Sequence, residues 1–279
     1  MVTRRGANLG LNKHPDDVAK LLATGCNHIR WQIHIDPSLD WHNYRLAVST
    51  QVLELRDRIN EIIPKANVTL ALMTPPCGDK FWKSQELQKK LPELWVDIAG
   101  IMKRVPGILG FDLLNEPRLT TARWRELAER TIRRIKAIDP KRRCIVSSRK
   151  GEPGELGALG KVEGADLYTV HFYSPMSYTH QGVLPGYAAP KKLPAEEPRK
   201  ALATMQRLAA SVNKPLYVGE FSCACGSPQE DTWLVEVTRH LLRNKIHGAY
   251  HAWKEAEVWS HDSSPSRERV LLRYFGGGA

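Results

Sequence analysis

The chain has 279 residues, of which 42% are hydrophobic, and its mean hydropathy is −0.39. These values are typical of a globular protein with a sizeable core, arranged as one large α/β domain or two small ones. Its apolar stretches are too short to span a bilayer, so we expect no membrane partner. The start shows no signal-peptide core, so either the protein is cytoplasmic, or it is secreted and a leader was removed before Met1.

Lysine and arginine outnumber aspartate and glutamate by 41 to 30, which gives a net charge of +11. No helix-turn-helix, zinc-finger or RNP-type pattern accompanies this charge, so we interpret it as solvated helix surface and expect no nucleic-acid partner. The five cysteines are irregularly spaced, which argues against a disulfide framework. Cys223-Ala224-Cys225 lacks a second pair, so we expect no metal and no cofactor.

Apolar segments alternate with amphipathic ones along the whole chain. The first helix is predicted to begin at His14-Pro15, with acidic residues in its first turn, and to end at Gly25. Segment 151–154 begins a loop with at most a short helix, and 174–198 is a long, functional loop. Strands are predicted at 3–10, 26–35, 68–73, 108–116, 144–148, 166–173, 216–220 and 248–253. Further helices are predicted at 44–63, 84–105, 120–138, 199–212, 229–244 and 267–274.

This alternation of strand and helix predicts a parallel sheet. Eight units in a chain of this length match the size of a (β/α)8 TIM barrel, an α/β fold. No linker-like boundary and no short-period repeat interrupt the pattern. We therefore expect a single domain over residues 1–279, and a monomer.

Polar side chains recur near the C-terminal ends of the predicted strands. Both faces of a parallel barrel strand are buried, so such groups are costly unless they are satisfied or functional. Their convergence on one end of the barrel is typical of an active site. Alternation along each strand shows which of these residues share a face. They are His28, Arg30, Gln32 and His34 on the second strand, Asp112 and Glu116 on the fourth, Thr169, His171 and Tyr173 on the sixth, Leu216, Val218 and Glu220 on the seventh, and His251 and Trp253 on the eighth.

Two of these residues are glutamates on opposite walls of the barrel. Glu116 lies in Asn115-Glu116-Pro117, where the proline ends the fourth strand, and Glu220 ends the seventh. Two carboxylates that face each other suit glycoside hydrolysis, since one protonates the leaving oxygen and the other attacks the anomeric carbon or activates water. A separation of about 5–5.5 Å would indicate retention, and about 6.5–9.5 Å inversion.

Five further side chains fit supporting roles. Arg30 can hold Glu220 ionised as a nucleophile, and Tyr173 is placed to do the same. Asn115 can bond a sugar 2-hydroxyl, and His171 can orient Glu116 or bind a hydroxyl. Trp253 offers a flat face to a pyranose ring, although a core aromatic is an equally good interpretation of that residue alone.

Six short stretches follow one another along the chain in an order that a known family shares. They are Arg5–Gly10, Ile29-Arg30-Trp31, Leu114–Pro117, Val170–Tyr173, Gly219-Glu220-Phe221 and Ala252-Trp253. In these stretches the chain resembles the retaining glycosidases of clan A, most closely glycoside hydrolase family 5, the cellulase family. The resemblance implies that Glu116 is the acid/base and Glu220 the nucleophile of a double displacement, supported by Arg30, Asn115, His171, Tyr173 and Trp253.

The chain departs from the family at the end of the third strand, where a histidine is usual. That place reads Leu72–Pro76 without a histidine, and His28, His34 or Trp41 are candidates to fill the space. From the resemblance as a whole, we expect a hydrolase that cleaves a β-1,4-glucan from within, with a polysaccharide or oligosaccharide as its partner. Mannan, xyloglucan or a short oligosaccharide remain alternative substrates. A non-catalytic carbohydrate-binding barrel and a basic nucleic-acid-binding protein are the alternatives of other classes.

Overall fold

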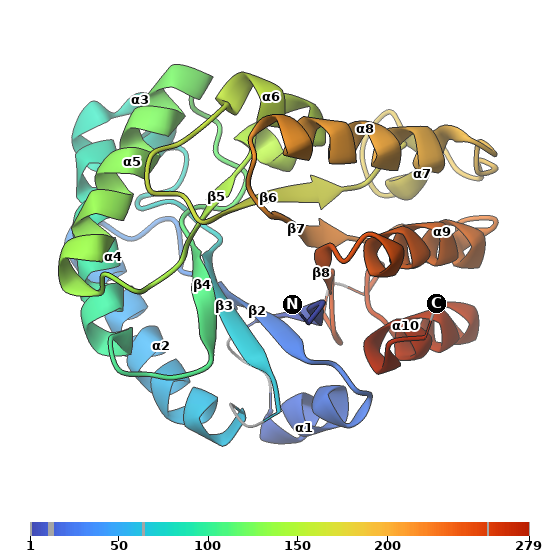
Figure 1. Ribbon diagram of the computed structural model, residues 1–279, viewed down its shortest axis with the longest axis horizontal. Coiled ribbons are helices and arrows are strands. Elements are labelled where there is room, and N and C mark those ends of the chain that lie inside the picture. The colour runs from blue at the N-terminus through green and yellow to red at the C-terminus, as the bar shows by residue number, and fades with distance from the viewer. Residues whose placement is uncertain (1, 11–13, 63–64, 256, 279) are drawn as a thin grey trace.

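Eight parallel strands close into a barrel in which each strand pairs with its neighbours in chain order and the last pairs with the first (Figure 1). The structure is a computed structural model and describes residues 2–10, 14–62, 65–255 and 257–278. The predicted (β/α)8 barrel is confirmed. The strands are β1 (Arg5–Gly10), β2 (His28–Ile33), β3 (Asn67–Leu72), β4 (Ile108–Asp112), β5 (Cys144–Ser147), β6 (Leu167–Phe172), β7 (Leu216–Phe221) and β8 (His247–Tyr250).

Helices surround the strands in a ring (Figure 1). Serine and threonine side chains cap several of them: Ser84 accepts from the Leu87 N–H, Thr120 from the Arg123 N–H and Ser264 from the Arg267 N–H. The helices are α1 (Pro15–Ala23), α2 (Trp41–Ile62), α3 (Lys80–Lys83), α4 (Gln85–Met102), α5 (Thr121–Ile138), α6 (Leu156–Leu159), α7 (Met176–Thr179), α8 (Glu197–Ser211), α9 (Glu230–Arg243) and α10 (Pro265–Gly276), with 3-10 turns at Arg149–Gly151 and Pro153–Glu155.

Buried tryptophans fix two of these helices to the ends of strands. Trp95 of α4 donates its indole N–H to the Leu113 carbonyl at 2.9 Å, and Trp124 of α5 donates to the Ser147 carbonyl at 2.8 Å. Both rings are fully buried, so each bond forms where water cannot compete. The segments after β4 and β5 are thereby held in place at the C-terminal end of the barrel.

Some element boundaries differ from the prediction. β4 ends at Asp112 and β8 at Tyr250, so Glu116, His251 and Trp253 lie in connections beyond strand ends. The long loop carries the short helix α7, and α3 precedes α4. Across the described residues, no helix is both long and apolar enough to cross a bilayer. The single domain over residues 1–279 stays a prediction.

A β-bulge in β7 reverses the direction of Glu220. Val170 of β6 pairs with Val218, but the next residue, His171, pairs with Glu220, so Gly219 is an extra residue in β7. The predicted grouping of Glu220 with Leu216 and Val218 on one face is therefore wrong, because one inserted residue turns every later side chain to the other face. A Cβ on Gly219 would lie 2.5 Å from Thr169 Oγ1, so glycine is needed there.

Candidate active site

Arg30 of β2 is the centre of a buried network inside the barrel. Its guanidinium donates to Asp112 Oδ2 from Nε at 3.1 Å and from Nη2 at 2.8 Å, and to Glu220 Oε1 from Nη1 at 2.8 Å. It also donates to Asn8 Oδ1 and Asn115 Oδ1 at 3.0 and 2.9 Å. The side chain is fully buried, so these charge-assisted bonds form away from water. One cation thus connects β1, β2, the fourth strand's end and β7.

Glu220 is held as a carboxylate. Its Oε2 accepts a hydrogen bond from the Tyr173 hydroxyl at 2.9 Å, and its side chain is only 7% exposed. Burial by itself would raise the pKa of Glu220, but the charges of His171, His251 and Arg30, with the Tyr173 bond, lower it well below the usual range. An ionised carboxylate held between fixed donors is a suitable nucleophile.

Glu116 has a more open environment. Its side chain is 40% exposed, and its backbone adopts a φ of +42°, in the left-handed region. Its Oε1 lies 2.8 Å from His171 Nδ1. Gly151 makes room for this contact, because a Cβ there would lie 2.8 Å from His171 Nδ1 and 3.2 Å from Glu116 Oε1. Access to solvent lets this carboxyl exchange a proton, as a general acid must.

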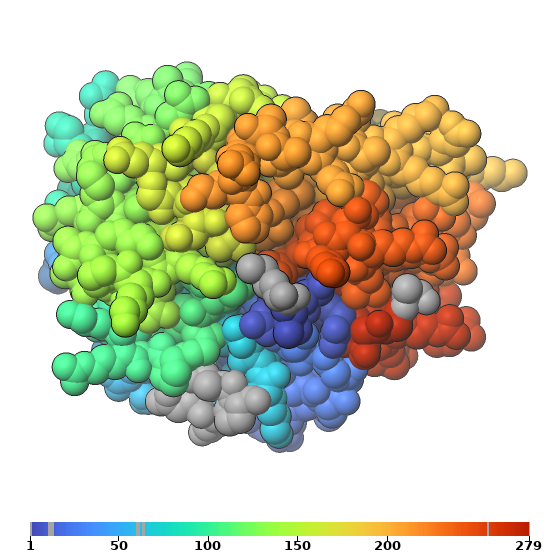
Figure 2. Space-filling view, viewed as in Figure 1, coloured from blue at the N-terminus to red at the C-terminus, as the bar shows by residue number. Residues whose placement is uncertain are grey.

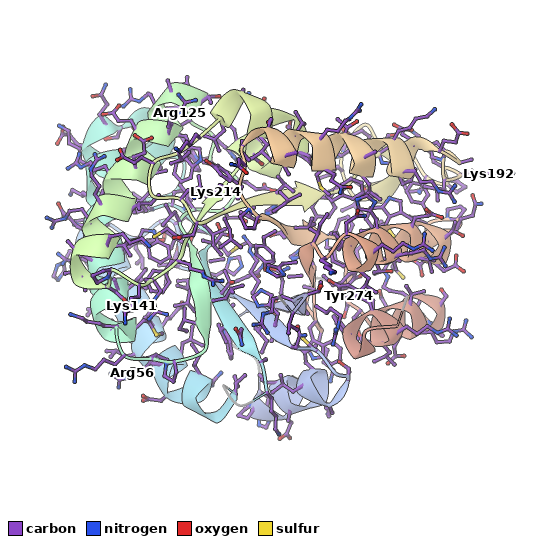
Figure 3. All side chains as sticks on the ribbon, viewed as in Figure 1. Arg56, Arg125, Lys141, Lys192, Lys214 and Tyr274 are labelled. Atoms are coloured by element: carbon purple, nitrogen blue, oxygen red, sulfur yellow. The ribbon has the colours of Figure 1, made fainter. Side chains whose placement is uncertain are left out.

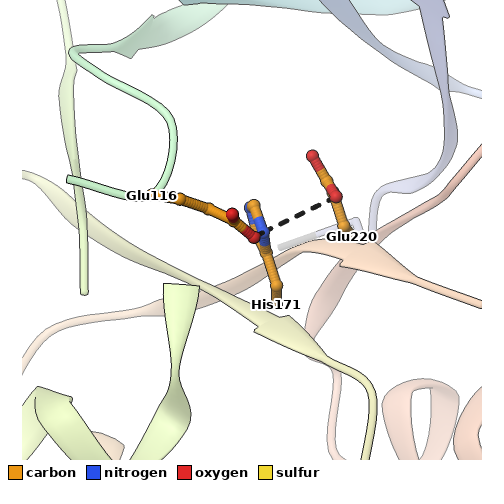
Figure 4. A group of neighbouring side chains, drawn as sticks. All are labelled: Glu116, His171 and Glu220. Atoms are coloured by element: carbon orange, nitrogen blue, oxygen red, sulfur yellow. Dashed lines mark hydrogen bonds and ion pairs between the residues drawn. The ribbon is translucent and has the colours of Figure 1, made fainter. Parts of the chain in front are cut away.

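His171 of β6 lies between the two glutamates (Figure 4). Its Nδ1 is 2.8 Å from Glu116 Oε1 and 3.5 Å from Glu220 Oε2. One nitrogen or oxygen atom from each of the three side chains lies within 4.8 Å of those of the other two. Burial lowers the pKa of His171, but the charges of Glu220 and Glu116 and the Glu116 bond raise it above 6.5 overall. The imidazole therefore offers a proton between the carboxylates.

Among the residues that the structure describes, these three form the one group of possible ligand side chains spaced closely enough to hold a metal ion. However, Arg30 and Tyr173 already donate to both oxygens of Glu220, and a cation bound there would meet the Arg30 charge. We therefore assign the group to acid–base chemistry. Burial raises the pKa of the Cys223 thiol to about 12, which disfavours the thiolate that a metal at Cys223-Ala224-Cys225 would need.

Asn115 is oriented by the same network. Because its Oδ1 accepts from Arg30 Nη2, the amide nitrogen is the group left for a ligand. Within the part of the chain that the structure describes, that nitrogen has no hydrogen-bond partner. The structure therefore brings Arg30, Asn115, Glu116, His171, Tyr173 and Glu220 together at the C-terminal end of the barrel.

Trp253 does not join them. Its side chain is only 3% exposed, its ring stacks on His261 at a centroid distance of 3.5 Å, and its indole N–H donates to the Asp17 carbonyl at 3.0 Å. A ring covered in this way presents no open face to a sugar. The prediction of a sugar platform is corrected, because the chain beyond β8 turns Trp253 into the core between α1 and α10.

Three further residues lie at this site, to which the sequence assigned no role: His251, Trp259 and His180. His251 follows β8 directly, its charge acts on Glu220, and its Nδ1 is buried without a hydrogen-bond partner in the described structure. Trp259, from the same connection, packs edge-on against Tyr173 at 6.1 Å and His180 at 5.0 Å. The alternation at the end of the eighth strand signalled His251, but nothing in the local pattern signalled Trp259 or His180, which lie in long connections.

The three candidates for the place of the missing strand-three histidine have different surroundings. His34 Nε2 lies 3.1 Å from Gln32 Oε1; burial lowers the pKa of His34 while the charge of Glu220 raises it. His28 instead contacts the Tyr217 hydroxyl and the Asn67 carbonyl at the opposite end of the strands. Trp41 begins α2 and packs under the Lys90 ammonium at 5.4 Å. His34 is thus the candidate on which the charge of Glu220 acts.

Several curated and solved proteins are similar to this chain. Endoglucanase C of Acetivibrio thermocellus and endoglucanase C307 of Clostridium sp. are each 26% identical over 177 residues, covering 59% of this chain and 51% of the relative. The chain therefore spans about half the length of the curated relatives it matches. Among solved structures, the cellulose synthase subunit Z of Clostridioides difficile has a TM-score of 0.83 at 18% identity, covering 98% of this chain and 99% of that chain.

A hyperthermophilic endo-β-1,4-glucanase solved with its substrate has a TM-score of 0.81 at 17% identity, covering 97% of this chain and 96% of that chain. Thermotoga maritima Cel5A, solved with mannotriose and with cellobiose, has TM-scores of 0.75 and 0.78 at 18% and 19% identity, covering 98% of this chain and 97% of that chain. At such identities the likeness shows the fold alone. The family model described as Cellulase (glycosyl hydrolase family 5) matches residues 16–257, and the chain belongs to this family.

Proposed function

We propose that the chain is a retaining glycosidase that hydrolyses β-1,4 linkages within a β-glucan. The observation that carries this proposal is the approach of Glu116 and Glu220, whose facing oxygens lie within 4.8 Å of each other. Measured between the carboxyl groups, an inverting pair stands about 6.5–9.5 Å apart to admit a water, and a retaining pair about 5–5.5 Å apart. A gap of at most 4.8 Å between the facing oxygens leaves little room for such a water, which supports direct attack by one carboxylate on the anomeric carbon.

The unequal environments of the two carboxyls assign their roles. Glu220, buried and ionised beside Arg30, attacks the anomeric carbon, while Glu116 protonates the glycosidic oxygen as that bond breaks. Asn115 donates its amide N–H to the sugar 2-hydroxyl, a contact that strengthens as the ring becomes cationic. The product of this step is a glycosyl ester on Glu220, a free leaving group and an ionised Glu116.

The second step returns the enzyme to its starting state. Glu116, now a carboxylate, takes a proton from a water that attacks the anomeric carbon, and the ester bond to Glu220 breaks. His171 positions Glu116 through the 2.8 Å contact, and its proton offsets the negative charge that Glu116 carries between the two steps, while Glu220 is a neutral ester. Two inversions at the same carbon leave its configuration unchanged.

The relatives support glucan as the substrate, since both curated matches are named endoglucanases. Mannan is the second candidate, because Thermotoga maritima Cel5A of the same fold has been solved with mannotriose as well as cellobiose. A carbohydrate-binding barrel without catalysis is less well supported, because binding alone does not require two carboxylates at this spacing with one held ionised.

The test is turnover on a panel of soluble β-glucan, β-mannan and xylan, with the first product followed by NMR. We expect β-glucan to be cleaved fastest and the β-anomer to appear before mutarotation. Initial release of the α-anomer would overturn the retaining mechanism, and faster cleavage of mannan would move the substrate assignment to the second candidate.

Glu220→Gln and Glu116→Gln separate the two roles. Each should reduce turnover of the polysaccharide at least about 10³-fold with an unchanged circular dichroism spectrum. On an aryl glycoside with an acidic leaving group, Glu116→Gln should still release the phenol in a burst, because that departure needs no proton. Glu257→Gln, an exposed glutamate in the connection after β8, is the matched control and should keep wild-type turnover. Wild-type turnover by either active-site variant would refute the role given to that residue.

A further inference from the structure

The two ends of the barrel carry different charge. The floor, defined as the N-terminal end of the barrel, contains ten cations and three carboxylates among its described residues. The mouth, the strand-to-helix connections at the other end, contains eight cations and ten carboxylates among its described residues. The floor consists of segments 2–4, 24–27, 65–66, 103–107, 139–143, 160–166, 212–215 and 244–246.

Most of the cations among the described floor residues have no carboxylate partner. Arg142 pairs with Asp139 at 2.9 Å, and Asp166 is paired with Lys136 of α5 at 3.2 Å. Among the described floor residues, this leaves Glu163 as the one carboxylate outside an ion pair. The exposed cations include Lys103, Arg104, Lys141, Arg143, Lys161 and Lys245, and none of them has an ion pair within the described structure. The floor therefore presents a nearly uncompensated positive surface.

Like charges also approach one another near the floor's centre. Burial and the nearby Arg143 charge lower the pKa of Arg4. Burial, Arg4 and Arg143 together lower the pKa of His247 to about 4, while the Arg4 N–H donates to His247 Nδ1 at 3.1 Å. Crowding of cations without carboxylates costs free energy in the isolated protein, and an external anion relieves that cost.

The arrangement of the cations indicates the shape of the anion. They follow α2, α4, α5, α6, α8 and α9 in turn, so they surround the barrel axis instead of forming a stripe. Lys141 and Lys214 are labelled in Figure 3, in the view that Figure 2 shows with atoms as spheres. The floor segments contain no Trp, Tyr or Phe on which a nucleic-acid base could stack. An extended planar surface meets such a ring of charge better than a linear polymer does.

We infer that the floor is a docking surface for an anionic lipid bilayer, bound peripherally through phospholipid headgroups. The net negative mouth lies at the other end, so an anionic surface attracts one end of the molecule and repels the other. Docking in this way holds the site at Glu116 and Glu220 away from the lipid and open to a glycan. The absence of a spanning segment, from which the sequence predicts no membrane partner, is compatible with this inference because peripheral binding needs no such segment.

The test is sedimentation of the full chain with vesicles of phosphatidylcholine, or of phosphatidylcholine mixed equally with phosphatidylglycerol. We expect binding to the anionic vesicles alone, and its loss when salt is raised from about 0.1 M to about 0.5 M. Equal binding to both vesicles, or tighter binding to a soluble polyuronate or RNA than to the anionic vesicles, would overturn the inference.

Two variants with the same net charge separate the effect of where the cations lie on vesicle binding from the effect of the protein's net charge. Lys103→Glu/Lys141→Glu/Lys161→Glu changes the floor, and Lys191→Glu/Lys192→Glu/Arg207→Glu changes exposed cations elsewhere. The floor variant should lose more than about tenfold in vesicle affinity, and the control less than about twofold. Equal losses would show that net charge alone drives binding. Turnover of soluble glycan by the floor variant should be unchanged, which reports separately on the proposed enzymatic function and on folding.

Discussion

The same types of charged side chain behave differently at the mouth and at the floor of this barrel. Inside the barrel, beneath the mouth, Arg30 is buried within hydrogen-bond distance of two buried carboxylates, Asp112 and Glu220. At the floor, Lys141 and Arg143 are exposed and unpaired in the described structure. Charges that are removed from water interact strongly and fix each other's protonation, whereas exposed charges are screened by water and salt and interact weakly. Burial, more than residue type, therefore separates the site for chemistry from the surface for docking.

Arg30→Met tests the mouth side of this comparison and should have the largest effect on stability. It leaves Asp112 and Glu220 buried without their cation, so we expect a loss of about 3–5 kcal/mol in the free energy of unfolding. Arg143→Met at the floor removes a similar, exposed side chain and should change it by less than about 0.5 kcal/mol. Urea denaturation measures both, and equal effects would contradict the contrast.

Gly151→Ala tests the contact between His171 and Glu116. The added Cβ would lie 2.8 Å from His171 Nδ1, at a backbone φ of +72° that disfavours alanine. We expect a loss of about 1–3 kcal/mol in stability, with a larger fractional loss in kcat than in KM. Gly154→Ala is the control, because a Cβ there has nothing within 4 Å. Unchanged kcat in Gly151→Ala would show that the His171–Glu116 contact does not matter for turnover.

We expect the pKa values of two histidines to depart from 6.5 in opposite directions. The pKa of His171 is raised above 6.5 by Glu220 and Glu116, and that of His247 is lowered to about 4 by burial, Arg4 and Arg143. The contribution of His171 to stability is therefore present below pH 6.5 and is lost as pH rises through its folded pKa. For His247, the unfolded chain binds the proton more readily, so its effect reduces stability as pH falls from 6.5 to about 4.

NMR titration of the histidine ring signals measures both values. Glu116→Gln should lower the pKa of His171 and leave His247 unchanged, and Arg143→Gln should do the reverse by raising the pKa of His247. A shift in the pKa of both histidines in either variant would show that the two ends of the barrel are electrostatically coupled, which would contradict their independence.

Substitutions in the connection that follows β8 should have the smallest effects on turnover and stability. His251→Ala removes a polar group near Glu220, and we expect kcat/KM to fall about 3–10-fold with little change in stability. Trp253→Phe removes the bond to the Asp17 carbonyl and should reduce stability by about 1 kcal/mol with normal kinetics. The reverse pattern, measured by steady-state kinetics and urea denaturation, would restore Trp253 as a substrate-binding residue.

The sequence predicted what depends on periodicity and missed what depends on the path of the chain. Eight apolar segments predicted the barrel, and the strand ends placed Arg30, Glu116 and His171 at one site because parallel strands end at one edge. The direction of Glu220 depends on the bulge at Gly219, which alternation cannot reveal. The burial of Trp253 and the position of Trp259 depend on how the connection after β8 folds back onto distant elements.

The guanidinium of Arg30 reaches groups on β1, near β4 and on β7, and the same ion keeps the Glu220 carboxylate charged. Closing of the barrel therefore brings Arg30 to Glu220 and ionises the nucleophile in the same step. A partly opened barrel, in which β2 has left its neighbours, would keep much of its helix content but lose the charged state on which turnover depends. Catalytic rate in this protein should therefore decline before circular dichroism reports any unfolding.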